Sequence, residues 1–324
     1  MMFQKKLKLA LLGLLLCVGA STWAQEDNWP SGPITLVLGF APGGPNDLVA
    51  RALALRLADQ LKQSVVVENR PGANANIAAG LVARAKPNGY TFLYNSTSLA
   101  ISPAMYKQLN YDALKDLTPV SATATLPMVL VVEKSAPVNN MKEWIAYVRS
   151  QPGKMNYGTG GTGNLSHLAM AVILDANGLK AEATPYKGMS EAMSGLLGNY
   201  TQFQLDSVNS PLPLIKSGKL KALFVTSGQR SAVLPDVPTL IESGLDLNVT
   251  AWQGIMAPAG TPPAIVQKMS AEVVKAMNSP QMKATLEAQG AYGIAGTPAE
   301  YDTMFRRDMK NYEKAVRQLN LPRE

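Results

Sequence analysis

The sequence predicts an α/β protein with two lobes, each a mostly parallel sheet flanked by helices. Three observations support this prediction. Segments typical of strands and of helices alternate along almost the whole chain, a pattern that favours parallel sheets covered by helices. One α/β unit is complete near residue 123, and a second begins near residue 126. The C-terminal helices have no strands of their own, so we expect them to pack back on the first unit.

The first unit is predicted from apolar or β-branched runs that end at turn signals. Residues 34–40 form an apolar strand, and a helix begins after Pro45. A β-branched strand at 65–68 precedes a helix at 74–85, which Lys86-Pro87-Asn88-Gly89 ends. The next strand, 90–94, leads into the polar run 95–98.

The second unit repeats the pattern. Its expected strands are 127–133, 155–157, 183–186, 201–205 and 222–226, and its expected helices include 141–149 and 164–176. A strand at 249–256 and helices at 263–277 and 299–319 follow, the last with an apolar stripe at helical spacing. We therefore predict one lobe from residues 25–125 plus 251–324 and another from 126–250. The two crossings, near 125–129 and 250–256, would form a hinge beside a ligand cleft.

The first 24 residues have the pattern of a cleavable signal peptide. Lys5, Lys6 and Lys8 form a basic region, residues 7–20 are otherwise apolar or small, and Thr22-Trp23-Ala24 fits a cleavage site. Leu16 before Cys17 disfavours a lipoprotein, and cleavage removes the only cysteine. The formal charge then falls from +7 to +4 with the loss of those three lysines, and no basic cluster supports nucleic-acid binding. We expect a periplasmic protein without disulfides.

A strand, a glycine turn and a helix start follow one another at residues 34–51. The first N–H groups of a helix have no internal partner, and the helix dipole favours negative charge there. This segment therefore predicts a site for a small anion. Its candidate ligand-binding residues are Phe40, Pro42, Gly43, Gly44, Asn46 and Asp47.

The glycine run 158–163 repeats this arrangement in the second unit. It also fits the G-x-G-x-x-G dinucleotide pattern, with Glu182 about 20 residues on. An exported protein meets little NAD, and Glu182 does not end its strand, so we favour carboxylate binding; a plain tight turn is the other alternative. The candidate residues are Thr159, Gly160, Thr162, Gly163, Asn164 and His167.

Other polar residues follow predicted strands and so face the same edge of a sheet. Asn95, Ser96 and Thr97 either cap the next segment or line the cleft. Tyr186 and Lys187 follow another strand, where the lysine either attracts an anion or is solvated. Asp206 either accepts a hydrogen bond from a ligand or holds a loop N–H.

The sequence does not favour catalysis or a cofactor. Ser166 and His167 are adjacent, so on a helix their side chains point about 100° apart. The G-x-S-x-G motif is missing, and no pair of carboxylates is placed for acid–base chemistry. One histidine and no mature cysteine disfavour a transition-metal site.

Several segments, in one order, resemble the substrate-binding proteins of tripartite tricarboxylate transporters, the Bug/TctC receptors. They are Pro42-Gly43-Gly44-Pro45-Asn46-Asp47 with Ala50-Arg51, Val67 to Ala73, Pro87-Asn88-Gly89-Tyr90-Thr91, Tyr157 to Ala169, Pro185-Tyr186-Lys187-Gly188, Ile215 to Leu223, Leu234-Pro235-Asp236-Val237-Pro238-Thr239, and Trp252-Gln253-Gly254 with Ala257 to Pro262. Two departures stand out. Residues 74–78 read Asn-Ala-Asn-Ile-Ala where the family usually has Gly-Gly-Asn-Ile-Gly, and residues 246–250 lack the usual Gly-Tyr-Glu.

The resemblance implies a type II periplasmic binding protein, a "Venus flytrap" whose two glycine loops grip a ligand carboxylate. The residue matching Asp206 would lie in the cleft on the other lobe. The implied ligands are di- or tricarboxylates, aromatic carboxylates or amino acids, and the implied partners are integral-membrane transporter subunits. We expect a monomer without catalysis, cofactor or metal. A receptor that presents its ligand to a two-component sensor, or a periplasmic enzyme acting on a carboxylate, are the alternatives.

Overall fold

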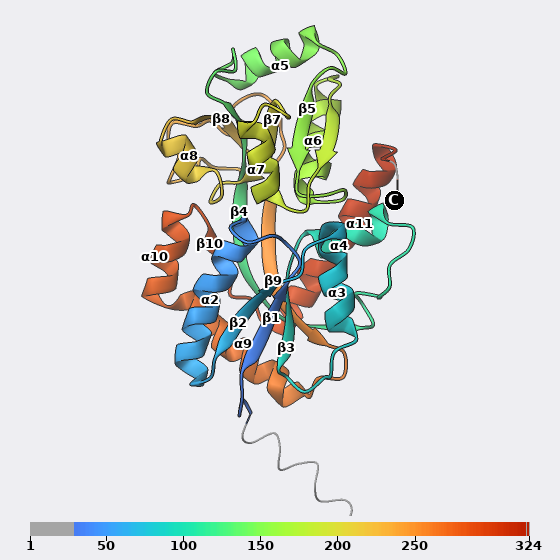
Figure 1. Cartoon of the computed structure of the whole chain (residues 1–324), viewed down its shortest axis with the longest axis vertical. Helices are drawn as coiled ribbons and strands as arrows, with labels where there is room; N and C mark the ends of the chain where they lie inside the picture. The colour runs from blue at the N-terminus through green and yellow to red at the C-terminus, as the bar shows by residue number, and fades with distance from the viewer. Residues whose placement is uncertain (1–28, 322, 324) are drawn as a thin grey trace, which may run out of the picture.

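The chain folds into two lobes, one above the other in Figure 1. The computed structural model describes residues 29–321 and 323, so the predicted signal peptide at 1–24 lies outside the described residues. Strand β4 (Leu117–Glu133) runs through both lobes and belongs to both sheets. This architecture confirms the predicted two-lobed α/β fold. The exact lobe boundaries remain a prediction.

The lower sheet has the order β2-β1-β3-β9-β4-β10. Its parallel part consists of β1 (Ile34–Leu38) between β2 (Val65–Asn69) and β3 (Thr91–Ser96). Strand β9 (Thr250–Pro258) is antiparallel to β3 and β4, and β10 (Tyr292–Gly293) is antiparallel to β4. The sheet is therefore parallel at one side and antiparallel around the strands that lead to the other lobe.

The upper sheet repeats this division. Strand β5 (Asn156–Thr159) is parallel to β6 (Glu182–Pro185) on one side and to β7 (Phe203–Ser207) on the other. The second half of β4 is antiparallel to β7 and to β8 (Leu220–Val225). In both lobes the parallel strands come from the α/β repeats that the sequence predicts.

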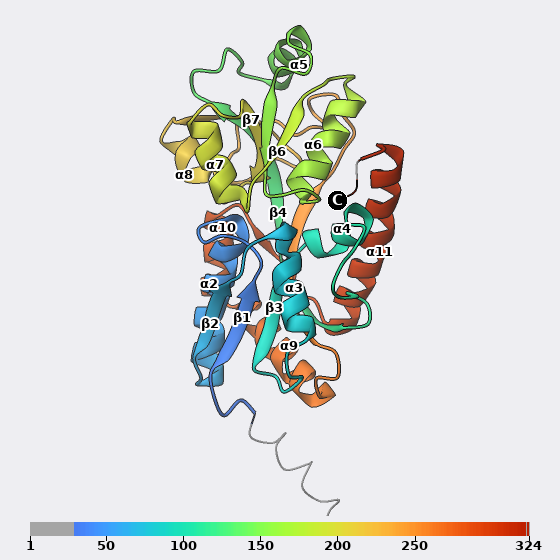
Figure 2. The ribbon, with the colours of Figure 1, turned by 45° about the vertical axis from the view of Figure 1, so that its right-hand side comes forward.

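Helices cover both faces of each sheet (Figure 2). Those of the lower lobe are α2 (Pro45–Leu61), α3 (Asn76–Ala83), α4 (Ser98–Met105), α9 (Pro263–Asn278), α10 (Pro280–Ala288) and α11 (Pro298–Gln318). Those of the upper lobe are α5 (Met141–Ser150), α6 (Leu165–Ala176), α7 (Met189–Leu197) and α8 (Leu212–Lys216). The predicted helix at 74–85 is shorter, because a 3-10 turn, η1 (Ala73–Ala75), precedes α3.

Each lobe has an apolar core. In the lower lobe, Leu53 of α2 and Met269 of α9 pack on one face of the sheet, while Tyr301 and Phe305 of α11 pack on the other. The apolar stripe of α11 is thus a packing surface. In the upper lobe, Trp144 lies edge-on to Phe203, with ring centroids 5.3 Å apart. Among the described residues, no helix combines the length and apolar character needed to cross a membrane.

Candidate functional site

A small cavity lies where the two lobes meet. Its volume is about 30 Å³, room for one or two water molecules. Both lobes supply its wall, so the lobes are closed on one another. The lining residues are Phe40, Ala41, Gly44, Pro45, Asn46, Ser96, Thr97, Met128, Asn164, Leu165, Ser166, Met189, Asp206, Ser207 and Ala251.

The N-termini of four helices converge on this interlobe cavity. Helices α2 and α4 reach it from the lower lobe through Asn46 and Thr97, and α6 and α7 reach it from the upper lobe through Leu165 and Met189. Each N-terminus carries a partial positive charge equivalent to about half an elementary charge. Four such ends around one space favour an anion there.

The N-terminus of α2 is open toward the cavity. Its N-cap, Gly44, has no side chain to cap the helix, and Pro45 has no N–H. Among the described residues, the N–H groups of Asn46 and Asp47 have no protein acceptor, since the first helical bond runs from Leu48 N to Gly44 O. Two backbone donors are therefore available to a ligand oxygen.

Asp47 holds the loop before α2 in place. Its carboxylate accepts hydrogen bonds from the Gly43 N–H at 3.0 Å, Arg51 Nε at 2.9 Å and Asn69 Nδ2 at 2.9 Å. Asn69 Nδ2 also donates to the carbonyl of Phe40. Burial raises the pKa of Asp47, but these hydrogen bonds and the charge of Arg51 outweigh it, so the pKa is lowered overall. Asp47 thus positions the loop through its side chain.

Asn164 links the upper lobe to the lower one. Its Oδ1 caps α6 by accepting from Ser166 N at 3.0 Å. Its Nδ2 crosses to the lower lobe, donating to Ser98 Oγ at 3.2 Å and to Asn74 Oδ1 at 3.4 Å. Asn74 has left-handed backbone angles and lies in the segment where the sequence departs from the resembled family. Asn74, the asparagine that departs from the resembled family, therefore supports closure.

Other hydrogen bonds also join the lobes. The hydroxyl of Tyr106 donates to the carbonyl of Thr162 at 3.0 Å. Asn209 Nδ2 donates to the carbonyl of Pro45 at 3.2 Å. Each contact ties one of the two glycine turns to the opposite lobe.

Asp206 is the ionisable residue of the cavity wall. It lies near the end of β7 and is fully buried. Its carboxylate accepts from the Ser207 N–H at 2.7 Å and from Gln204 Nε2 at 3.1 Å. Burial raises the pKa of Asp206 to about 7, although the hydrogen bonds from Ser210, Ser207 and Gln204 act in the opposite direction.

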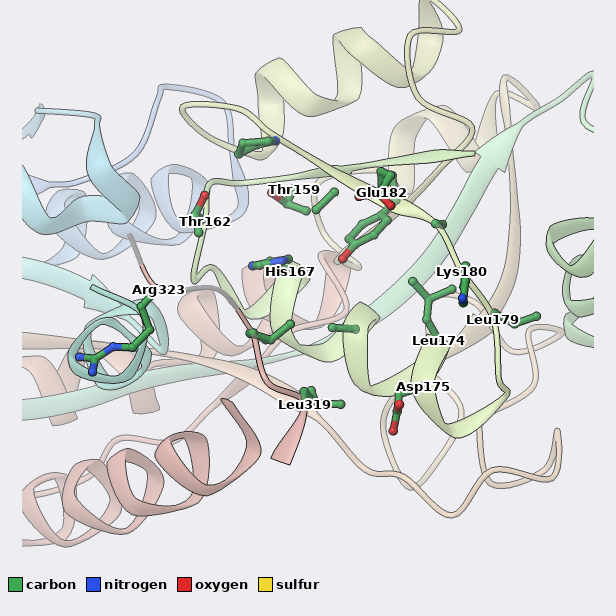
Figure 3. A pocket seen from close by; sticks show the side chains of 16 residues that line it. Thr159, Thr162, His167, Leu174, Asp175, Leu179, Lys180, Glu182, Leu319 and Arg323 are labelled. Carbon is green, nitrogen blue, oxygen red and sulfur yellow. The ribbon is translucent and has the colours of Figure 1, made fainter. Parts of the chain in front are cut away.

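Three of the predicted site residues line a different space. Thr159, Thr162 and His167 face a larger groove of about 560 Å³ between α6, β6 and the C-terminal segment (Figure 3). His167 Nδ1 accepts from the Gly163 N–H at 3.3 Å, and its ring stacks on Tyr157. These three side chains therefore lie on the side of the glycine run 158–163 that faces the outer groove, away from the interlobe cavity.

The other predicted residues divide into two groups. Phe40, Gly44, Asn46, Ser96, Thr97, Asn164 and Asp206 line the interlobe cavity. Pro42, Gly43, Asp47, Asn95, Gly160, Gly163, Tyr186 and Lys187 line neither space. Asn95, for example, accepts from the Tyr301 hydroxyl at 2.5 Å, which ties β3 to α11. Ligand contact by any of these residues remains a prediction.

Sequence reasoning did not select several of the lining residues. The sequence indicates a role for Ser166 only beside His167, yet its hydroxyl accepts from Gly160 N at 3.2 Å, and Ser166 lines the cavity from α6. Met189 was not selected either, although Gly188 before it is the same signal of an uncapped helix start that marks α2. Ser207 lines the cavity beside Asp206.

Two lobes around a closed cavity at converging helix N-termini define a two-lobed binding protein of the periplasmic type. The profile of the tripartite tricarboxylate transporter family receptor matches residues 49–321. The chain belongs to this family of solute-binding receptors, which confirms the family that the sequence motifs indicate. Among the described residues, no group of three or more His, Cys, Asp and Glu side chains could hold a metal ion.

Individual relatives cover nearly the whole chain. The UPF0065 protein from the tcbD-tcbE intergenic region of Pseudomonas sp. (strain P51) is 35% identical over 310 residues, which are 94% of this chain and 92% of that protein. The structure of the periplasmic binding protein BugD is 32% identical with a TM-score of 0.88, covering 91% of this chain and 100% of that one. The structure of R. palustris Rpa4515 with adipate is 30% identical with a TM-score of 0.89, covering 92% and 100%.

Proposed function

We propose that this protein captures a small organic carboxylate in the interlobe cavity, in the periplasm, and delivers it to the membrane subunits of a tripartite transporter. The observation that carries this proposal is the convergence of four helix N-termini on one closed cavity. The adipate-bound relative from R. palustris supports a carboxylate as the ligand. Family membership supports the transporter as the partner.

Because the closed cavity has room for only one or two water molecules, the lobes would open to admit the anion and then close over it around a wider cavity. The N–H groups of Asn46 and Asp47 and the hydroxyls of Ser96 and Thr97 replace water around the carboxylate. Hydrogen bonds to a charged group contribute about 1.5–3 kcal/mol each. Several of them account for micromolar binding, which corresponds to about −8 kcal/mol. The contacts of Asn164 with Ser98 and Asn74 then hold the lobes together.

The geometry supports binding without a reaction. The Ser166 hydroxyl is engaged by Asn164 and by the Gly160 N–H. His167 accepts from the Gly163 N–H and faces the other groove. A nucleophile and its base must lie within hydrogen-bond reach of one another. Ser166 and His167 do not form such a pair on this helix.

A thermal-shift screen of carboxylates followed by calorimetry tests the proposal. We expect at least one small carboxylate to raise the melting temperature and to be recovered unchanged after incubation. Gly44→Leu places a bulky side chain at the N-cap of α2, in the cavity wall, and should weaken binding of that ligand at least tenfold. Gly32→Leu, a glycine of the same lobe away from the cavity, is the matched control and should bind normally. Failure of every carboxylate to bind would refute the proposal.

A further inference from the structure

We infer that the ligand is a bipolar organic acid: a carboxylate at one end and a hydrogen-bond donor, an ammonium or a hydroxyl group, at the end that meets Asp206. This inference rests on the proposed function and narrows its substrate class. It disfavours ligands that carry a second ionised carboxylate at that end. The observations behind it concern the two sides of the interlobe cavity, which differ in the polar groups that they offer.

The lower-lobe side offers donors. The N–H groups of Asn46 and Asp47 have no protein acceptor among the described residues, and the hydroxyls of Ser96 and Thr97 lie beside them in the wall. The dipoles of α2 and α4 add positive potential on this side. This combination suits a carboxylate.

The upper-lobe side also contributes helix N-termini, those of α6 and α7, but its strand β7 adds a carboxylate to the wall. Asp206 is the one ionisable side chain among the described residues that line the cavity; lysine, arginine and histidine are all missing from this wall. Its protein partners, the Ser207 N–H, Gln204 Nε2 and the Ser210 hydroxyl, are all neutral. The nearby Asp47 and Arg51 are already paired with one another at 2.9 Å. A fully buried carboxylate with neutral partners lacks a compensating charge.

Two buried asparagines outside the cavity lining show the same division. On the lower lobe, Asn74 contacts the lining residue Asn164, and its Nδ2 is a donor with no partner among the described residues. On the upper lobe, Asn209 Oδ1 is an acceptor with no partner, and the orientation of that amide is fixed because its Nδ2 donates to the carbonyl of Pro45. The site therefore favours a ligand that accepts hydrogen bonds at its lower-lobe end and donates them at its upper-lobe end.

A second ligand carboxylate would meet Asp206 without any cation between them. Two like charges in contact inside a protein repel each other strongly. For such a ligand to bind, either its second carboxylate or Asp206 must first take up a proton from the solvent. An ammonium group gains the attraction of Asp206 in the same place, and a hydroxyl group donates to it without repulsion.

Two matched series of acids test this inference by calorimetry at pH 8. One series is malonate, succinate, glutarate and adipate. The other replaces one carboxylate by an aminomethyl group, which keeps the number of carbons, and runs from β-alanine through 4-aminobutyrate to 6-aminohexanoate. Butyrate and 4-hydroxybutyrate complete the four-carbon set. At the chain length that binds most tightly, we expect the amino or hydroxy acid to bind at least tenfold more tightly than the dicarboxylate.

Removal of the charge should remove this preference. In Asp206→Asn, the ratio of amino-acid to dicarboxylate affinity should fall at least tenfold. Asp175→Asn, an exposed aspartate of α6, is the matched control and should leave the ratio unchanged. In the wild-type protein, a change from pH 8 to pH 6 protonates Asp206 and should weaken the amino acid by up to tenfold, which needs no variant.

The outcomes separate the two hypotheses. If dicarboxylates bind more tightly than their amino and hydroxy analogues at pH 8, or if Asp206→Asn leaves the ratio unchanged, the bipolar ligand is refuted while carboxylate capture stands. If no acid of any kind binds, both fail. Melting curves of both variants establish that they are folded before affinities are compared.

Discussion

The turn before α3 contains strain that a single substitution should relieve. Ala73, Asn74 and Ala75 all have positive φ, at 45°, 52° and 73°. A left-handed residue other than glycine costs about 1–2 kcal/mol. Glycine avoids this cost but loses about 0.5–1 kcal/mol through its greater freedom in the unfolded chain. Because Ala73 is exposed, its methyl group contributes little packing, so Ala73→Gly should stabilise the fold by about 0.5–1 kcal/mol.

Thermal and urea unfolding measure this effect. We expect the melting temperature of Ala73→Gly to rise by roughly 1–3 °C, given that about 1 kcal/mol corresponds to 2–4 °C in chains of this size class. Ala271→Gly is the matched control: it is also exposed but lies inside α9, where glycine costs about 1 kcal/mol. The two variants should shift stability in opposite directions. A decrease in both would show that the turn is not strained.

Two further predictions concern the loops around the cavity. Asp47→Ala leaves the Gly43 N–H without its acceptor, removes one of the two acceptors of Asn69 Nδ2 and leaves Arg51 without its partner. It should lower the free energy of unfolding by about 2–4 kcal/mol in urea titrations at pH 7. The pKa of Asp47 is lowered in the folded protein, so the ionised carboxylate stabilises the fold at pH values above its unfolded pKa. This stabilisation is lost as the pH falls from the unfolded toward the folded pKa. The variant lacks it from the start and should therefore lose less stability than wild type on acidification to pH 3. Gly188→Val places a side chain where a Cβ already comes within 3.3 Å of Ala41 N, so closure should be hindered. The affinity of Gly188→Val for a carboxylate ligand should drop at least tenfold, while the melting temperature of the ligand-free protein stays unchanged. Normal affinity would contradict the closed arrangement of the lobes.

Local signals made much of the fold predictable from sequence. The strand–glycine–helix segments at 34–51 and 156–176 are contained in short stretches, so composition and turn residues were sufficient. The first half of β4 was missed because residues 121–125, Ser-Ala-Thr-Ala-Thr, are small and polar rather than apolar. That half is a strand because β9 pairs with it, from Thr125↔Trp252 to Leu117↔Pro258, and such a long-range partner leaves no local signal.

The candidate site was less predictable because the directions of its side chains depend on the loop path. Gly161 and Gly163 have φ of 120° and 75°, and the turn that they make directs Thr162 and His167 to the outer groove while Asn164 reaches the cavity. The contact between Asn164 and Asn74 joins residues 90 positions apart. A single sequence contains neither the turn direction nor that pairing.

The continuous strand β4 implies an order of events during capture. It leaves the lower sheet at Pro127, which pairs with Thr250, and enters the upper sheet at once, where Met128 pairs with Ser207 and Val129 with Asp206. At this crossing the lobes are therefore joined by paired strands, and β4 has no unpaired linker between the two sheets. Asp206 lies on the second paired position beyond this crossing, so a rotation of the lobes about the crossing would displace it less than the glycine loops farther out. In the binding mode proposed above, the ligand would first be held at Asp206 in the open protein, and the glycine loops would then close on its carboxylate.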